Sequence, residues 1–245
     1  MSRYARVLIA AISVAMCICW TGCGGGSTPH RCQGSTCVPS AGKFLYVTAL
    51  DDVTTFRVNA AGMLTEPHNQ SGPNQSIGVV ADPSGKFLYV SDFENATIEA
   101  FTINRSSGLL TPIGSPVSAG SPPDAGGLAI HPAGKFLYVT LMNSGGVAGF
   151  SIDPVTGALS PIPGASIPAG NTPVQAIVDF SGKFLYVSNL NDSLGAISGY
   201  SIDPTTGDLT PIPGSPFPTQ AGFPGPAVSQ SGQAGSSFTW AWSAQ

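Results

Sequence analysis

The chain has 245 residues and a formal net charge of −4, and only 9% of its residues are charged, against about 25% in an average soluble domain. From Cys23 onward, seven Lys and Arg stand against thirteen Asp and Glu, a net charge of −6. This balance provides no basic stripe for nucleic acid, so a nucleic-acid partner is not expected. The 31 glycines and 22 prolines are typical of a chain with many turns between short elements.

The first 22 residues are predicted to be a secretion signal. Arg3 and Arg6 precede an apolar run over residues 7–20, which is too short to cross a bilayer core of about 30 Å as a helix. The run ends in "WTGC" and resembles a bacterial lipoprotein signal, in which a small residue precedes the lipidated cysteine. Gly22 and Cys23 fit that pattern, and Trp20 departs from the usual leucine.

We therefore expect lipid attachment at Cys23, and a bacterial cell envelope location, periplasmic or at the cell surface. Residues 23–40, which begin with the glycine-rich "GGGS", are predicted to be a flexible tether. The alternative is an ordinary secreted protein with an incidental cysteine. Cys32 and Cys37 could form a disulfide after export. They are too few for a metal site, and neither a metal nor a cofactor is expected.

The hexapeptide "GKFLYV" occurs at residues 42–47, 85–90, 134–139 and 182–187, at spacings of 43, 49 and 48 residues. A period of 40–50 residues is typical of propellers and repeat arrays. Each period alternates short apolar runs with turn signals, which indicates an all-β repeat of four strands, the blade of a β-propeller.

The turns and the strand composition support this interpretation. "ADPSGK" places Asp82, Pro83 and Gly85 at the positions that a type I turn prefers. "KFLYV" has no polar face, and a strand that is apolar on both faces is buried on both faces. The tyrosines of the repeat are therefore predicted to lie mostly buried between blades; they are Tyr46, Tyr89, Tyr138 and Tyr186.

The segments "KFLYVTAL", "KFLYVSDF" and "KFLYVSNL", the last two followed by an aromatic strand and an "LTPI" motif, resemble the YVTN-type repeats of the lactonase-like seven-bladed propellers. That family includes bacterial 6-phosphogluconolactonases, a fungal muconate-lactonising enzyme and many exported lipoproteins. The resemblance covers residues 41–232 and leaves 233–245 as an irregular tail. It implies a propeller fold and a lactone hydrolase as one possible activity.

The repeats predict fewer blades than the family has. Three full blades are expected at about residues 75–116, 124–164 and 173–215. Residues 43–66 supply three further strands, and 225–232 supply a single first strand. These two pieces could pair and close a four-bladed ring. Alternatively, a frameshift after Gly232 makes the chain a fragment of a larger propeller.

The loops between the second and third strands are expected on the same rim as the loops that link blades. They carry carboxylate and amide groups suited to a sugar or a hard cation: Asp51, Asp52, Asp92, Asn95, Asn143, Asn189, Asn191 and Asp192. The alternative is that these residues only form turns. His68 is placed in an inter-blade loop with Glu66 nearby, and His131 is expected to cap a turn on the opposite rim.

Other cationic residues offer little to a site on this rim. One lysine follows the same turn in every repeat, which indicates a structural role, and Arg57 and Arg105 are expected near outer strands. No residue can be matched to a catalytic residue of the family. Three functions stay open: an envelope binding lipoprotein with a protein or carbohydrate ligand, a lactonase-type hydrolase acting on sugar lactones, and a truncated fragment without a function of its own.

Overall fold

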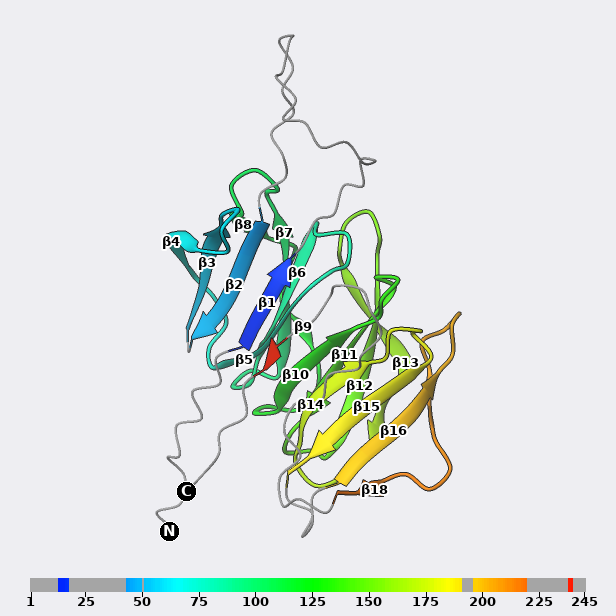
Figure 1. Ribbon diagram of the computed structural model, residues 1–245. Helices are drawn as coiled ribbons and strands as arrows, with labels where there is room; N and C mark the ends of the chain where they lie inside the picture. The colour runs from blue at the N-terminus through cyan, green and yellow to red at the C-terminus, as the bar shows by residue number, and fades with distance from the viewer. Residues whose placement is uncertain (1–12, 18–42, 50, 191–195, 220–237, 240–245) are drawn as a thin grey trace, which may run out of the picture.

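The computed structural model describes residues 13–17, 43–49, 51–190, 196–219 and 238–239, which form four antiparallel sheets (Figure 1). The first sheet has the order β19-β1-β2-β3-β4. Its strands are β1 (Ser13–Cys17), β2 (Lys43–Ala49), β3 (Asp52–Val58), β4 (Leu64–Ser71) and β19 (Phe238–Thr239). Within the described ranges there is no helix long and apolar enough to cross a membrane.

The next three sheets repeat one order of four strands, in which consecutive strands are paired. The second sheet contains β5 (Ser76–Ala81), β6 (Phe87–Asp92), β7 (Thr97–Ile103), β8 (Leu110–Pro112) and β9 (Val117–Ser118). The third contains β10 (Ala125–Ile130), β11 (Phe136–Leu141), β12 (Gly146–Ile152) and β13 (Leu159–Pro168). The fourth contains β14 (Pro173–Val178), β15 (Phe184–Asn189), β16 (Ala196–Ile202), β17 (Leu209–Pro211) and β18 (Phe217–Pro218). Two short strands, β9 and β18, pair instead with the third strand of their sheet, β7 and β16. The predicted β-propeller blades, including the three full ones, are confirmed.

The first hairpin of a sheet is held by the aspartate predicted from "ADPSGK". Asp82 Oδ1 accepts hydrogen bonds from the Lys86 and Phe87 amides, both at 2.7 Å, and its Oδ2 accepts one from the Ser84 amide at 3.0 Å. Gly85 ends the turn with φ +67°, a left-handed conformation that glycine adopts without a Cβ penalty. Asp179 holds the equivalent turn of the fourth sheet in the same way.

The sheets stack face to face, and the core lies in the three junctions between them. Inner strands β1, β5, β10 and β14 pack in that order, and the sheets follow one another in Figure 1 from the blue and cyan first to the yellow and orange fourth. Tyr46, Tyr89 and Tyr138 are completely buried in these junctions, as predicted. Tyr186 is only half-buried, so the tyrosine of the last repeat is covered less completely than the other three.

The first sheet is completed differently from the prediction. One of the two alternatives had residues 225–232 supply its innermost strand, but β1 pairs with β2 there, with Ser13 opposite Thr48 and Cys17 opposite Phe44. β1 has the sequence Ser-Val-Ala-Met-Cys and pairs antiparallel with β2. The backbone N–H and C=O groups along this edge of β2 therefore have partners. β1 lies inside the segment predicted as a signal peptide, and residues 225–232 lie outside the described residues.

Candidate functional site

The loops between second and third strands share one edge of the molecule with the links between sheets, as predicted. We call this edge the site rim and the opposite edge, which carries the Asp82 turn, the turn rim. On the site rim, the Leu190 amide donates to the Thr172 carbonyl at 3.0 Å and the Met142 amide donates to the Asp124 carbonyl at 3.1 Å. The backbone therefore fixes loop and link against each other in these sheets.

Asp92 and Asn95 hold the site-rim turn of the second sheet. Asp92 is 3% exposed; its Oδ1 accepts from the Asn95 amide at 2.9 Å and its Oδ2 from Asn95 Nδ2 at 2.8 Å. Both carboxylate oxygens are thus used within the turn, which is the structural role considered for these residues.

The third sheet builds its rim turn around an aspartate that the sequence analysis missed. Asp124 is completely buried; its Oδ1 accepts from the Asn143 amide at 2.8 Å, and its Oδ2 accepts from the Ser144 hydroxyl. Asn143 Nδ2 donates to the Pro123 carbonyl at 2.5 Å. The corresponding link positions carry Gln75 and Thr172, and this departure from the repeat was the available signal.

Asn189 of the fourth sheet is also completely buried. Its Nδ2 donates to Ser198 Oγ at 3.0 Å, while its Oδ1 has no hydrogen-bond partner in the part of the chain that the structure describes. An unsatisfied buried amide oxygen is uncommon in folded proteins. The neighbouring predicted residues Asn191 and Asp192 lie outside the described residues.

Glu99, which the sequence analysis missed, is a carboxyl group on this rim whose pKa is shifted by its surroundings. It lies on β7 opposite Val90, and its side chain is half-buried. Burial, followed by the nearby charge of Asp92, raises the pKa of the Glu99 carboxyl. In the third and fourth sheets the same position carries Ala148 and Ser198, so a comparison of the third strands could have found it.

Two further predictions concern the first sheet. Asp51 and Asp52 are exposed at its site-rim end, as expected of this loop. His68 does not lie in an inter-blade loop: it is an exposed residue of the outer strand β4, opposite Thr55. The polar run that contains it extends the sheet because β4 pairs along most of β3. The predicted loop position of His68 is therefore wrong, and its part in ligand binding stays a prediction.

Of the residues that the structure describes, the turn rim holds the other histidine and both arginines. His131 Nδ1 accepts from the Ala133 amide at 3.0 Å, which confirms its capping role. Its Nε2 then carries the proton and donates to the Gly182 carbonyl at 3.1 Å. Arg105 donates to the Ser84 carbonyl at 2.6 Å, and Arg57 forms an ion pair with Glu66 at 3.0 Å.

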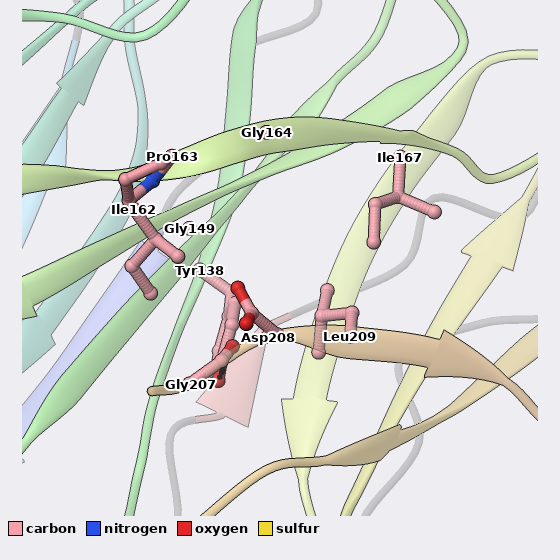
Figure 2. A pocket seen from close by; sticks show the side chains of 9 residues that line it. All are labelled: Tyr138, Gly149, Ile162, Pro163, Gly164, Ile167, Gly207, Asp208 and Leu209. Atoms are coloured by element: carbon pink, nitrogen blue, oxygen red, sulfur yellow. Dashed lines mark hydrogen bonds between the residues drawn. The ribbon is translucent and has the colours of Figure 1, made fainter. Parts of the chain in front are cut away.

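A pocket of about 250 Å³ lies between the third and fourth sheets (Figure 2). Ile162, Ile167 and Leu209 give it apolar walls, and Asp208 is its one charged lining residue. In Figure 2, Tyr138 lies beside Gly207, whose carbonyl accepts its hydroxyl proton at 2.8 Å. Gly207 belongs to a turn-rim loop, so this pocket is separate from the site rim.

No cluster of His, Cys, Asp or Glu that could hold a metal ion occurs among the described residues. Cys23, Cys32 and Cys37, predicted for lipid attachment and a disulfide, lie outside the described ranges.

Comparisons with known proteins identify what this architecture is similar to. The model of the family described as "Lactonase, 7-bladed beta-propeller" matches residues 28–124 and 123–221. No curated protein matches the sequence. Among solved structures, a candidate 6-phosphogluconolactonase of Bacteroides fragilis has 26% identity and a TM-score of 0.60, with 73% of this chain and 53% of that chain covered.

Two other solved structures are similar to this chain over a comparable part of its length, at lower sequence identity. A candidate 6-phosphogluconolactonase of Bacteroides uniformis has 21% identity and a TM-score of 0.62, with 72% of this chain and 52% of that chain covered. A periplasmic gluconolactonase of Pseudomonas aeruginosa has 19% identity and a TM-score of 0.59, with 71% and 52% covered. The chain thus spans about half the length of these relatives. With the family model matching most of its length and four sheets of the expected kind, the protein belongs to the lactonase family of seven-bladed β-propellers.

Proposed function

We propose that this protein hydrolyses a sugar lactone at its site rim, with Glu99 as the general base. The observation that carries the proposal is the Glu99 carboxyl, half-buried beside Asp92 with a raised pKa. A carboxyl group whose pKa is moved toward neutrality by its surroundings is a candidate for acid–base catalysis. Family membership supports lactones as the substrate class, and so does the similarity to structures named as a 6-phosphogluconolactonase and a gluconolactonase.

The reaction needs one water and one proton carrier. Glu99 takes a proton from water as the water oxygen attacks the lactone carbonyl, which gives a tetrahedral oxyanion. The oxyanion collapses by breaking the ring C–O bond, and the proton held by Glu99 passes to the leaving ring oxygen. The product is the open hydroxy acid, and the Glu99 carboxylate is regenerated.

The charge of the rim favours a neutral lactone over a phosphorylated one. The carboxyl groups of this rim in the described part of the chain are Asp51, Asp52, Asp92, Glu94, Glu99 and Asp124. Carboxylates repel an anionic substrate and lower its local concentration. We therefore infer that glucono-δ-lactone is hydrolysed faster than 6-phosphoglucono-δ-lactone.

The test is an assay of the full chain with both lactones, corrected for their uncatalysed hydrolysis. Glu99→Gln should lower kcat/KM by about 10²–10⁴-fold, the usual contribution of a general base. Glu94→Gln is the matched control, because Glu94 is an exposed carboxyl five residues away and should leave kcat/KM for the neutral glucono-δ-lactone unchanged. A wild-type rate equal to the uncatalysed rate, or full activity of Glu99→Gln, would contradict the proposal.

A binding role without turnover is the second candidate, and one observation favours it. Asp92, Asp124 and Asn143 use their polar atoms to hold turns, which suits a rigid binding surface. In that case calorimetric titration with glucono-δ-lactone gives saturable heat while no hydroxy acid forms.

We also propose that the protein is anchored in a bacterial envelope through a lipid on Cys23. The support is the sequence of the segment that ends in Gly22 and Cys23, followed by glycines. Lipidation at this position would hold the propeller at a membrane surface, in the periplasm or outside the cell.

A further inference from the structure

The three junctions between sheets are built from the same residues of the repeat. One sheet contributes its Phe and Tyr side chains, and the next sheet contributes its Leu and Val. Phe44 and Tyr46 thus share a buried cluster with Leu88 and Val90. The second junction joins Phe87 and Tyr89 to Leu137 and Val139, and the third joins Phe136 and Tyr138 to Leu185 and Val187.

Each junction is closed by a glycine in a turn-rim loop of the following sheet. The tyrosine hydroxyl donates to that glycine's carbonyl: Tyr46 to Gly108 at 3.0 Å, Tyr89 to Gly157 at 3.0 Å and Tyr138 to Gly207 at 2.8 Å. The phenylalanine ring lies against the same glycine, so closely that an added Cβ would lie 2.4–2.6 Å from the ring. Both sheets are therefore needed to bury one Phe-Tyr pair.

Among the described residues, no sheet or junction glycine of this kind lies against the Phe-Tyr face of the fourth sheet. Phe184 is 37% exposed, whereas Phe44, Phe87 and Phe136 are 3–5% exposed. Tyr186 is half-buried, and within the described residues no acceptor is hydrogen-bonded to its hydroxyl. An exposed apolar face of this kind on a soluble domain usually marks an interaction site.

The first sheet leaves the complementary face open. Leu45 and Val47 are half-buried, although the equivalent Leu and Val of the other sheets are completely buried. Gly62 occupies the junction-glycine position of this sheet with φ +79°, and no atom of the described residues lies within 4 Å of where its Cβ would be. Leu64 is 48% exposed, against 6% for its counterpart Leu110.

We propose that these two faces bind each other between two copies of the chain. The fourth-sheet face of one copy, with Phe184 and Tyr186, packs on the first-sheet face of a second copy, with Leu45, Val47 and Gly62. A second copy is the partner because every interior junction joins one Phe-Tyr face to one Leu-Val face. The fourth sheet exposes a face of the first kind and the first sheet exposes a face of the second kind. A head-to-tail contact that repeats and closes gives a ring. Two copies make a ring of eight sheets, which is within the usual range for propellers of about four to eight blades.

Sedimentation velocity on the full chain in a mild detergent tests this proposal. The wild type should sediment as a two-copy species that dissociates on dilution. Phe184→Asp changes the fourth-sheet face and Val47→Asp changes the first-sheet face, and each should weaken association at least tenfold. Val155→Asp is the matched control, because Val155 is 82% exposed in a turn outside both faces and should associate as the wild type does.

Mixing the two variants provides the sharper experiment. Phe184→Asp keeps an intact first-sheet face and Val47→Asp keeps an intact fourth-sheet face, so an equimolar mixture should form a one-to-one pair through the single undamaged junction. Recovery of association in the mixture also shows that both variants are folded. A monomeric wild type, or a mixture that stays monomeric while the wild type pairs, would overturn the head-to-tail arrangement.

Discussion

Glu99 places a carboxyl group at a strand position where the third and fourth sheets have Ala148 and Ser198. A residue that holds a repeated fold together is expected in each repeat, whereas a functional site needs a departure from the repeat. Burial and the charge of Asp92 then make the Glu99 carboxyl a stronger base than an ordinary glutamate. The chemistry proposed for the rim depends on this one difference.

The pH dependence of hydrolysis should follow the Glu99 pKa. A general base acts as the carboxylate, so kcat/KM rises with pH as Glu99 loses its proton, and the raised pKa places this rise above the pH expected for an ordinary glutamate. Asp92→Asn removes the neighbouring charge and should move the midpoint to lower pH. A pH–rate profile measures this; an unchanged midpoint in Asp92→Asn would contradict the role of Asp92.

His131 gives a separate prediction about stability. Burial lowers its pKa in the folded protein, while the unfolded chain has the ordinary value of about 6.5. Below that value the unfolded state binds the proton more readily, so the contribution of His131 is full above about pH 6.5 and is lost as pH falls toward the folded pKa. Urea unfolding at pH 7.5 and 5.5 measures this loss.

The matched variant is His131→Asp, which installs the aspartate of the equivalent turns at Asp82 and Asp179. Its loss of stability over the same pH range should be smaller than that of the wild type. Equal losses in the two proteins would show that another group is responsible.

The three junctions between sheets repeat one connection, in which a turn-rim glycine fits under the Phe ring of the preceding sheet. Gly157 has φ +76°, and an added Cβ would lie 2.5 Å from the Phe87 ring. Gly114 has φ +63° and open space around it. The two positions separate the cost of a left-handed backbone from the cost of disturbing a junction.

Both alanine variants should be destabilised by the backbone term of about 1–2 kcal/mol. Gly157→Ala should lose about 1–3 kcal/mol more than Gly114→Ala, because it forces the Phe87 ring to move within a packed core. Free energies of unfolding from urea titrations give the comparison. Equal losses would mean that the ring adapts freely and that the glycine does not fix the junction.

Four identical hexapeptides made the sheets predictable. Each hexapeptide is apolar at every position after the lysine and is bounded by turn signals, so a strand buried on both faces is the structure that fits it best. The Asp82 and His131 turns were predictable for the same local reason. The half-burial of Tyr186 was not predictable, because it depends on what packs against the outer face of the fourth sheet. His68 was misplaced because its polar segment looks like a loop, yet it extends β4. Glu99 is visible in sequence only when third strands are compared with one another.

At the scale of the whole molecule, β1 and the predicted signal peptide use the same residues. Cleavage before Cys23 would remove Ser13–Cys17 and leave the edge of β2 without its antiparallel partner. The processed protein would then need another strand at that edge.

Lipidation should be detected by labelling cells with a radioactive fatty acid. The wild type should incorporate the label, and Cys23→Ser should not, because serine lacks the thiol that receives the lipid. Mass spectrometry of the purified product gives the first residue of the mature chain. Equal labelling of both proteins would rule out Cys23 as the attachment site.

The arrangement of the whole molecule depends on junctions that bury three Phe-Tyr pairs and leave the fourth open. The most direct measurement compares Tyr138→Ala with Tyr186→Ala, the same residue of the same hexapeptide in successive sheets, at concentrations where the chain is monomeric. Tyr138→Ala should lose about 3–5 kcal/mol of unfolding free energy, as expected for a fully buried aromatic. Tyr186→Ala should lose less than about half of that, because its side chain is only half-buried and removes less apolar surface from water. Equal losses would contradict the account, because the fourth sheet would then be covered as fully as the others.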